Sequence, residues 1–307
     1  MPREEVAFQT DDNVTLRGWF FKPSNAGSKP LPCLVMCHGW SVVKEMGLDT
    51  YAEHFVSELP MSVLAYDHRG FGDSDIKDRA PRNEILPTQQ TSDFSHAITY
   101  AQSRSDVDMS KIGVWGSSYS GGHALWVGAV DRRVKLVLCQ VPMVDGWAVF
   151  HRLNRPDLVP AINEKFQEDR LSRATGNVPA TIPIIQADPT KPQVFPTSDS
   201  YQFFSSWEKK LPGKWKNEVT VRSLEALREY YPSAHIHHIS PTPILMIVAV
   251  DDVLTPPDLA LEAFERARQP KELYIVPGGH FDGYSGEAFK RNARKQVEFL
   301  RKYWFAN

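Results

Sequence analysis

Short, continuous apolar runs recur along this chain and alternate with longer stretches of helical pattern. A strand with one exposed face would alternate apolar and polar residues, so continuous runs indicate strands that are buried on both faces. Buried strands separated by helices predict a mostly parallel sheet covered by helices on both sides. The predicted buried strands are residues 32–37, 61–66, 111–116, 134–139, 244–249 and 272–276.

The start of the chain follows a different pattern. Residues 6–21 alternate apolar and polar side chains around Asp11-Asp12-Asn13, which predicts an antiparallel hairpin at a sheet edge. With this hairpin the sequence predicts an α/β fold whose mostly parallel sheet has eight strands. The predicted helices are residues 49–59, 89–103, 118–130, 257–268 and 287–305.

Residues 144–238 interrupt this alternation. The segment contains no buried-strand run and is rich in proline and aromatic residues. A long irregular stretch inside a compact fold is typical of a lid or a binding insert. We therefore expect an α/β core formed by residues 1–143 and 239–307, with residues 144–238 as a mainly helical lid. The alternative that the aromatic side chains only form a small core of the insert remains open.

Composition limits the function classes. The chain has 307 residues, of which 42% are hydrophobic and 23% charged, enough for one large buried core. Its formal net charge is −2 and no basic stripe is present, which argues against a nucleic-acid or anionic-membrane partner. No apolar stretch reaches the roughly 18 residues of a membrane span, and the first residues do not resemble a signal peptide.

The three cysteines lie in apolar runs and are expected to be small core residues. Cys33 and Cys37 share one predicted strand, and a rise of about 3.3 Å per residue separates them by roughly 13 Å, too far for a disulfide. Cys139 lies in another predicted strand. A reducing, cytoplasmic location is the simplest expectation.

The strand at residues 111–116 runs directly into the motif Gly116-Ser117-Ser118-Tyr119-Ser120-Gly121-Gly122 and then into a helical pattern. A strand, a tight turn and a helix with serine at the apex lift the hydroxyl of Ser118 out of the sheet. The turn is strained and requires small neighbours. Ser120 stands where the usual motif has glycine, and we interpret it as a small, tolerated variant.

A serine hydroxyl is a weak nucleophile that needs a base, a group to orient that base, and donors for the oxyanion. In an open α/β sheet such groups lie on loops at the carboxyl ends of strands. The loop after residues 244–249 contains Asp251 and Asp252, and the loop after residues 272–276 contains His280. The resulting order of serine, aspartate and histidine is the α/β-hydrolase order.

Outside the insert, the whole chain resembles an α/β-hydrolase. Within that superfamily, residues 38–46, 66–74 and 116–123 resemble a microbial branch of dienelactone-hydrolase-like proteins, also described as polyketide hydrolases or transferases. Fungal members of this branch are often linked to polyketide natural-product pathways.

The resemblance implies roles for individual residues. Ser118 would be the nucleophile, His280 the general base and then acid, and Asp252 the group that orients His280. The family places its acid four residues before a proline, and Asp252 lies four residues before Pro256. Asp251 is the alternative acid.

The oxyanion hole is expected to use the backbone N–H groups of Tyr119, directly after the nucleophile, and of Trp40. His38 precedes that loop and is expected to be structural. The loop at residues 67–74 is expected to build a turn, with Arg69 paired to a carboxylate or a backbone group.

Trp147 and Phe150 follow a predicted strand and could reach the pocket, so substrate contact and a place in the core of the insert both stay open. His235 and His237 would share one face of an extended segment. No cysteine or acidic residue lies nearby at ligand spacing, so no metal site is predicted. No cofactor is predicted either.

The sequence thus predicts a serine hydrolase that acts through an acyl-enzyme on a bulky apolar or aromatic, polyketide-like ester, lactone, thioester or 1,3-diketone. An acyltransferase with the same triad is one alternative, and a non-catalytic small-molecule binding protein is another. Ser118 argues against the dehalogenases and epoxide hydrolases of this fold, whose nucleophile is a carboxylate. The predicted partner is a small-molecule substrate, without nucleic acid or membrane, and a homodimer is left open.

Overall fold

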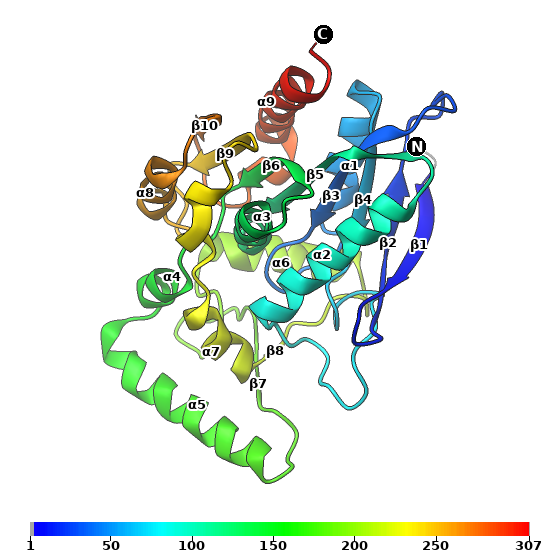
Figure 1. Cartoon of the computed structure of the whole chain (residues 1–307). Coiled ribbons are helices and arrows are strands. Elements are labelled where there is room, and N and C mark those ends of the chain that lie inside the picture. Colours follow the sequence, from blue (N-terminus) through cyan, green and yellow to red (C-terminus); the bar gives the residue numbers. More distant parts are fainter. Residues whose placement is uncertain (1–2, 307) are drawn as a thin grey trace.

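The computed structural model describes residues 3–306. A single eight-stranded sheet in the order β1-β2-β4-β3-β5-β6-β9-β10 forms its centre (Figure 1). The predicted α/β fold is thereby confirmed. The strands are β1 (Arg3–Gln9), β2 (Thr15–Phe21), β3 (Leu31–Cys37), β4 (Ser62–Tyr66), β5 (Val107–Ser117), β6 (Val134–Gln140), β9 (Ile244–Ala249) and β10 (Lys271–Val276).

The sheet is parallel from β4 to β10, as the continuous apolar runs predict. The predicted burial of residues 272–276 is wrong, because β10 lies at the edge of the sheet: Ile275 is exposed and only Val276 is buried. The hairpin is also confirmed, since β1 pairs antiparallel with β2 and forms the edge, and β2 pairs antiparallel with β4. In the centre, Val35 pairs with Val114 on one side and with Leu64 on the other. This order places the carboxyl ends of β3, β5, β6, β9 and β10 along one edge.

Helices cover both faces of the sheet (Figure 1). One face packs against α2 (Pro87–Ser103), α3 (Tyr119–Val130) and α8 (Pro257–Arg266), with Phe94 and Leu125 fully buried. The other face packs against α1 (Leu48–Glu58) and α9 (Gly286–Trp304), with Phe55 and Phe299 buried. Burying one such side chain contributes about 1.5–3 kcal/mol, so these two layers hold the sheet rigidly.

Residues 144–238 lie between β6 and β9 in sequence and at the carboxyl end of the sheet in space, with α5 extending farthest from it (Figure 1). The segment is mainly helical and adds one two-stranded antiparallel sheet. His235 and His237 lie in the 3-10 helix η2, so the extended conformation considered for them is wrong. The elements are α4 (Gly146–Leu153), η1 (Pro156–Leu158), α5 (Val159–Ala174), β7 (Thr181–Ile182), α6 (Ser198–Lys210), β8 (Val219–Thr220), α7 (Val221–Glu229) and η2 (Pro232–His238).

Cys33, Cys37 and Cys139 are buried free thiols, as predicted. Within residues 3–306 no helix is both long enough and apolar enough to span a membrane.

Candidate active site

Ser118 lies at the turn between β5 and α3, with φ 60° and ψ −125°. This positive φ is a strained conformation for a residue with a side chain. Backbone hydrogen bonds hold it there: the Ser118 N–H donates to the Gln140 carbonyl at 2.9 Å, and the Met143 N–H donates to the Ser118 carbonyl at 2.9 Å. Gly116 is required below the turn, because a Cβ atom on it would lie 1.8 Å from the Ser120 carbonyl oxygen.

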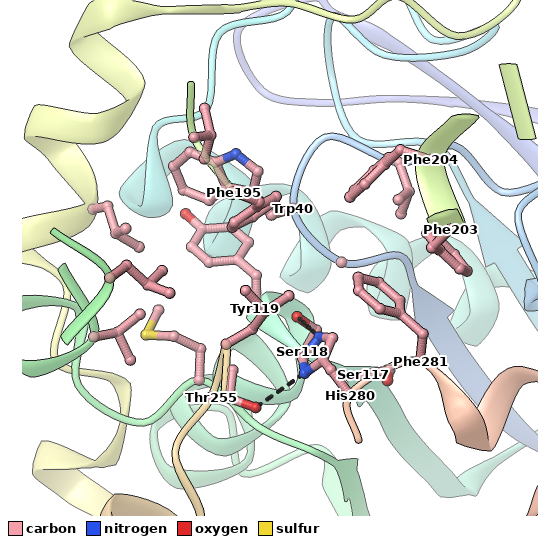
Figure 2. Close-up of a pocket in the computed structure, with 18 of the residues that line it drawn as sticks. Trp40, Ser117, Ser118, Tyr119, Phe195, Phe203, Phe204, Thr255, His280 and Phe281 are labelled. Atoms are coloured by element: carbon pink, nitrogen blue, oxygen red, sulfur yellow. Dashed lines mark hydrogen bonds between the residues drawn. The ribbon is translucent and has the colours of Figure 1, made fainter. Parts of the chain in front are cut away.

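The structure brings together the three side chains predicted from sequence. His280 Nε2 lies 2.9 Å from Ser118 Oγ, and His280 Nδ1 lies 2.7 Å from Asp252 Oδ2. Figure 2 shows Ser118 and His280 side by side at one end of the pocket. A general base requires this arrangement, in which Nδ1–H is donated to the carboxylate and Nε2 accepts the proton of the serine hydroxyl.

Asp252 is buried and accepts hydrogen bonds on both oxygens. The backbone N–H groups of Leu254 and Thr255 donate to Oδ1 at 2.9 and 2.8 Å. Burial alone would raise the pKa of this carboxyl, but the neighbouring His280 and the hydrogen bonds from Thr255 together hold the pKa of Asp252 below its ordinary value. Asp251, the alternative acid, is exposed.

Thr255 belongs to the site although sequence reasoning did not single it out. Its Oγ1 lies 2.8 Å from Asp252 Oδ2. The same oxygen lies 3.3 Å from His280 Nδ1 (Figure 2). The spacing of three residues after Asp252 was a usable signal, since aspartate commonly bonds backbone groups two or three residues ahead. Ser117 and Tyr284 were also missed: the Tyr284 hydroxyl donates to Ser117 Oγ at 2.6 Å, and both residues line the pocket.

The candidate oxyanion donors lie beside the nucleophile. A Cβ atom built on Gly39 would lie 3.2 Å from Ser118 Cβ, so the peptide that leads into Trp40 passes against the serine. Tyr119 is the first residue of α3, where N–H groups have no partner within the helix. Trp40 and Tyr119 thus both adjoin the nucleophile, as the predicted oxyanion hole requires.

Three buried histidines form a layer behind this loop. The His68 N–H donates to His38 Nε2 at 3.0 Å, and His38 Nδ1 lies 3.0 Å from the Gly39 carbonyl oxygen. Ser120 Oγ donates to the His38 carbonyl and lies 3.1 Å from His68 Nε2, so this serine is a structural partner rather than a merely tolerated variant. His38 is structural, in agreement with its expected role.

The third histidine, His123, continues the layer with its ring 5.5 Å from that of His68. Its two nitrogens lie 2.8 Å from the Tyr230 hydroxyl and 3.2 Å from Gln90 Oε1. Burial lowers the pKa of His123 to about 3 and the pKa of His38 and His68 below the usual value. These rings are thus uncharged at neutral pH.

A buried lysine anchors the loop that carries Trp40. Lys44 Nζ lies 2.6 Å from Asp67 and 2.5 Å from Asp73, while the Lys44 N–H donates to Asp67 at 2.8 Å. Burial alone would lower the pKa of Lys44, but the surrounding carboxylates raise its pKa above the ordinary value. Arg69 pairs with the carboxylates of Asp93 and Asp12, as expected for the loop at residues 67–74.

Two sets of polar groups lie at the carboxyl end of the sheet, and together we call them the polar floor. One set is Ser118, His280, Asp252 and Thr255. The other is His38, His68, Ser120, His123, Lys44 and Asp67.

Above the polar floor lies an apolar pocket with about 880 Å³ of empty space, part of it open to solvent. Residues 144–238 contribute much of its wall, including Phe150, Phe203 and Phe204. Trp147 does not line this pocket: it is 57% exposed and its ring lies against His151. The predicted substrate contact by Trp147 is therefore corrected, because α4 turns Val149 and Phe150 inward and leaves Trp147 on its outer face.

No group of three or more histidine, cysteine, aspartate or glutamate side chains within residues 3–306 is placed to hold a metal ion. Ser118, His280 and Asp252 place a hydroxyl, an imidazole and a carboxylate in contact one after the other. This geometry suits nucleophilic acyl transfer.

The sequence matches the X-Pro dipeptidyl-peptidase (S15) family over residues 12–282, most of its length. The chain belongs to this family. It is an enzyme of the α/β-hydrolase fold, and the resemblance drawn from residues 38–46, 66–74 and 116–123 is confirmed.

Relatives of this S15-family chain include fungal proteins of similar length. A thiohydrolase of Eupenicillium brefeldianum is 30% identical over 98% of this chain and 94% of its own. The polyketide transferase grgF of Penicillium sp is 30% identical over 99% and 97% of the two chains. The crystal structure of the α/β hydrolase GrgF from Penicillium sp. sh18 superposes with a TM-score of 0.84 at 29% identity, covering 99% of each chain.

Proposed function

We propose that this protein is a serine hydrolase or acyltransferase that forms an acyl-enzyme on Ser118. Ser118 Oγ attacks a carbonyl carbon while His280 Nε2 takes the hydroxyl proton, and the N–H groups of Trp40 and Tyr119 bind the oxyanion. The intermediate collapses as His280 returns that proton to the leaving thiol or alcohol. A water or acceptor hydroxyl, deprotonated by His280, then releases the acyl group and regenerates Ser118.

The observation that carries this proposal is the continuous chain of contacts from Asp252 through His280 to Ser118. The two distances, 2.7 and 2.9 Å, already allow proton transfer without rearrangement. Ligand binding alone does not require a strained serine aligned with a buried histidine–aspartate pair. Such strain costs on the order of 1–3 kcal/mol, so its presence favours a catalytic role.

The pocket supports an apolar acyl group as substrate. The described residues that line it include no aspartate, glutamate, lysine or arginine, and most of the wall is aliphatic or aromatic. The names of two relatives, a thiohydrolase and a polyketide transferase, support a polyketide-like thioester or ester. A dipeptidyl-peptidase substrate fits less well, because its free amino group would need an anionic partner that this wall does not offer.

We further propose that residues 144–238 act as the lid over the acyl group. Phe203 from α6 stacks on Phe281, the residue after His280, with ring centroids 4.2 Å apart. Phe204 stacks on Trp215 at 5.4 Å, and Trp215 Nε1–H donates to the Ser41 carbonyl at 2.8 Å. The segment thus closes the pocket through contacts with both the histidine loop and the oxyanion loop.

A fluorophosphonate probe tests the proposed acyl-enzyme. The expected result is a single covalent mass increase that peptide mapping places on Ser118. Ser118→Ala should abolish labelling, and Ser57→Ala, at an exposed serine that does not line the pocket, should leave it unchanged. A folded wild-type protein that stays unlabelled would overturn the proposal.

Hydrolysis and acyl transfer share the first half of the reaction, so products must separate them. Acyl thioesters would be incubated with and without an added alcohol, and the products followed by mass spectrometry. Free acid alone identifies a hydrolase, whereas an ester that depends on the alcohol and on Ser118 identifies a transferase.

Cytoplasmic location and a homodimer remain predictions for this protein. Cell fractionation and light scattering of the purified chain test them directly.

A further inference from the structure

The loop that carries His280 continues into a short turn, the 3-10 helix η3 (Asp282–Tyr284). The last residue of this turn, Tyr284, donates its hydroxyl hydrogen to Ser117 Oγ at 2.6 Å. Ser117 directly precedes the nucleophile, and both Ser117 and Tyr284 line the pocket. This bond therefore joins the histidine loop to the end of the strand that leads into Ser118.

A second phenol holds the neighbouring residue of η3. The fully buried Tyr51 hydroxyl donates to the Gly283 carbonyl at 2.7 Å and also lies 2.8 Å from Gln140 Oε1. The backbone carbonyl of Gln140 is the acceptor of the Ser118 N–H. Tyr51 thus connects the histidine loop with the residue that holds the nucleophile in its strained conformation.

The partners of η3 belong to the rigid part of the fold. Gln296 Nε2 donates to Gln140 Oε1 at 3.1 Å, and Trp115 Nε1–H donates to Gln296 Oε1 at 2.6 Å. Gly283 packs closely against α9, since a Cβ atom on it would lie 2.7 Å from Asn292 Nδ2. The turn after the histidine is therefore held by strands and helices rather than by another loop.

These contacts matter because Asp252 fixes only one end of the imidazole. The bond at Nδ1 leaves the ring of His280 free to pivot about that contact, whereas Nε2 must stay within hydrogen-bond reach of Ser118 Oγ, 2.9 Å away. A misplacement of about 1 Å can lower a rate about 100-fold. Burial raises the pKa of Tyr284 to about 12, so its hydroxyl stays protonated and donates throughout the neutral pH range.

We propose that the hydroxyl groups of Tyr284 and Tyr51 are positioning groups, which fix η3 and thereby hold His280 Nε2 within reach of Ser118 Oγ. This inference rests on the proposed acyl-enzyme function and adds two residues that act through its general base. Each hydroxyl should increase the rate of acylation while substrate affinity and the number of competent active sites stay the same.

The test follows fluorophosphonate labelling of Ser118 both as a rate constant and as the final fraction of labelled chains. Tyr284→Phe and Tyr51→Phe should each lower the rate constant at least about tenfold, while every chain is labelled at the end. Loss of structure alone would instead lower the final fraction and leave the rate constant of the folded chains unchanged. With a thioester substrate, kcat should fall in the same way and KM should stay within about threefold.

A double-mutant cycle tests whether the hydroxyls act through the base. His280→Ala should leave a slow residual labelling of Ser118, and adding Tyr284→Phe or Tyr51→Phe should change that residual rate less than about twofold. An equal loss with and without His280 would show that the hydroxyls act elsewhere and would overturn the inference.

Two further variants address the hydrogen bond itself. Ser117→Ala removes the acceptor of Tyr284 and should slow labelling as Tyr284→Phe does, with no further loss when the two are combined. Tyr231→Phe is the matched control, because the Tyr231 hydroxyl accepts a hydrogen bond from Arg266 Nη1 at 2.7 Å but the residue does not line the pocket. This variant should keep the rate constant of the wild type.

The outcomes separate this inference from the function on which it rests. If the wild type is labelled at Ser118 and both phenylalanine variants keep its rate constant, the positioning role is overturned and the proposed function stands. A lower final fraction at an unchanged rate constant overturns the positioning role as well, because it shows a purely structural contribution. If Ser118 of the folded wild type is not labelled, the proposed function is overturned, and the inference with it.

Discussion

The polar floor and the segment at residues 144–238 meet at the same pocket but are built from opposite chemistry. The floor joins Ser118 to His280 and Asp252, and His38 to His68, by hydrogen bonds of 2.7–3.0 Å. The segment above contributes aromatic rings that pack at 4.2–5.4 Å between centroids. Hydrogen bonds fix direction as well as distance, whereas ring packing mainly fills volume.

This difference assigns separate tasks to the two regions. A floor of directional contacts keeps the reacting atoms within the narrow geometry that catalysis requires. A wall of rings can repack around acyl groups of different shape at a cost of about 1 kcal/mol for each pair. Substitutions in the floor should therefore change the rate of the chemistry or the stability of the fold, and substitutions in the wall should change the choice of substrate.

The largest effect is expected at Asp252. Asp252→Asn removes the charge that stabilises protonated His280 and allows the wrong imidazole tautomer, so kcat should fall about 10⁴-fold. Asp251→Asn is the matched control one residue away, at an exposed side chain, and should change kcat less than about threefold. Steady-state kinetics on a thioester measures both. Equal effects of the two substitutions would show that the floor is not organised around Asp252.

The next effect concerns stability. Lys44→Met leaves Asp67 buried beside no cation, and breaking a buried ion pair in this way costs about 3–5 kcal/mol in the free energy of unfolding. Lys214→Met removes a half-exposed lysine that pairs with Glu45 at 2.7 Å, and should cost less than about 1 kcal/mol. Urea unfolding compares them. A small loss for Lys44→Met would mean that the floor tolerates an unpaired carboxylate.

The histidine layer should make the fold sensitive to acid. The pKa of His123 is about 3 in the folded chain, below the ordinary value of 6.5, so between these pH values only the unfolded chain binds the proton. Stability is therefore complete above pH 6.5 and falls as the pH drops, by on the order of 1.4 kcal/mol per pH unit for each such histidine. Urea unfolding at pH 7, 6 and 5 measures the slope.

A variant assigns that slope to the buried layer. His123→Asn should flatten the pH dependence by about one proton's contribution, on the order of 1.4 kcal/mol per pH unit. His235→Asn, at an exposed histidine in η2, should leave the slope unchanged. An equal change in both variants would place the acid sensitivity outside the layer.

The smallest effect on the chemistry is expected in the wall. Phe203→Ala removes the ring stacked on Phe281 and should lower stability by about 1 kcal/mol while labelling of Ser118 by a small fluorophosphonate stays within about threefold. Its chain-length preference, measured as kcat/KM over a thioester series, should shift toward bulkier acyl groups. Trp147→Ala, outside the pocket, should leave that preference as it is. A large loss of labelling in Phe203→Ala would give the wall a role in positioning the reacting groups.

The fold was predictable because its signals are local. Each buried strand of the parallel sheet is a continuous apolar run, and the turn at Gly116–Gly122 carries its own glycines. The order of Ser118, Asp252 and His280 at strand ends predicted which loops meet, since parallel strands place their carboxyl ends along one edge.

The tertiary structure decided what depends on contacts between distant residues. The pairing of Lys44 with Asp67, the bond from Ser120 to the His38 carbonyl and the inward turn of Phe150 rather than Trp147 have no signature in neighbouring residues. They arise when separate loops pack at one sheet edge and each buried polar atom must find a partner there. The sequence by itself thus determined the sheet and the order of the reacting residues, and tertiary packing decided how they are held and what the pocket can receive.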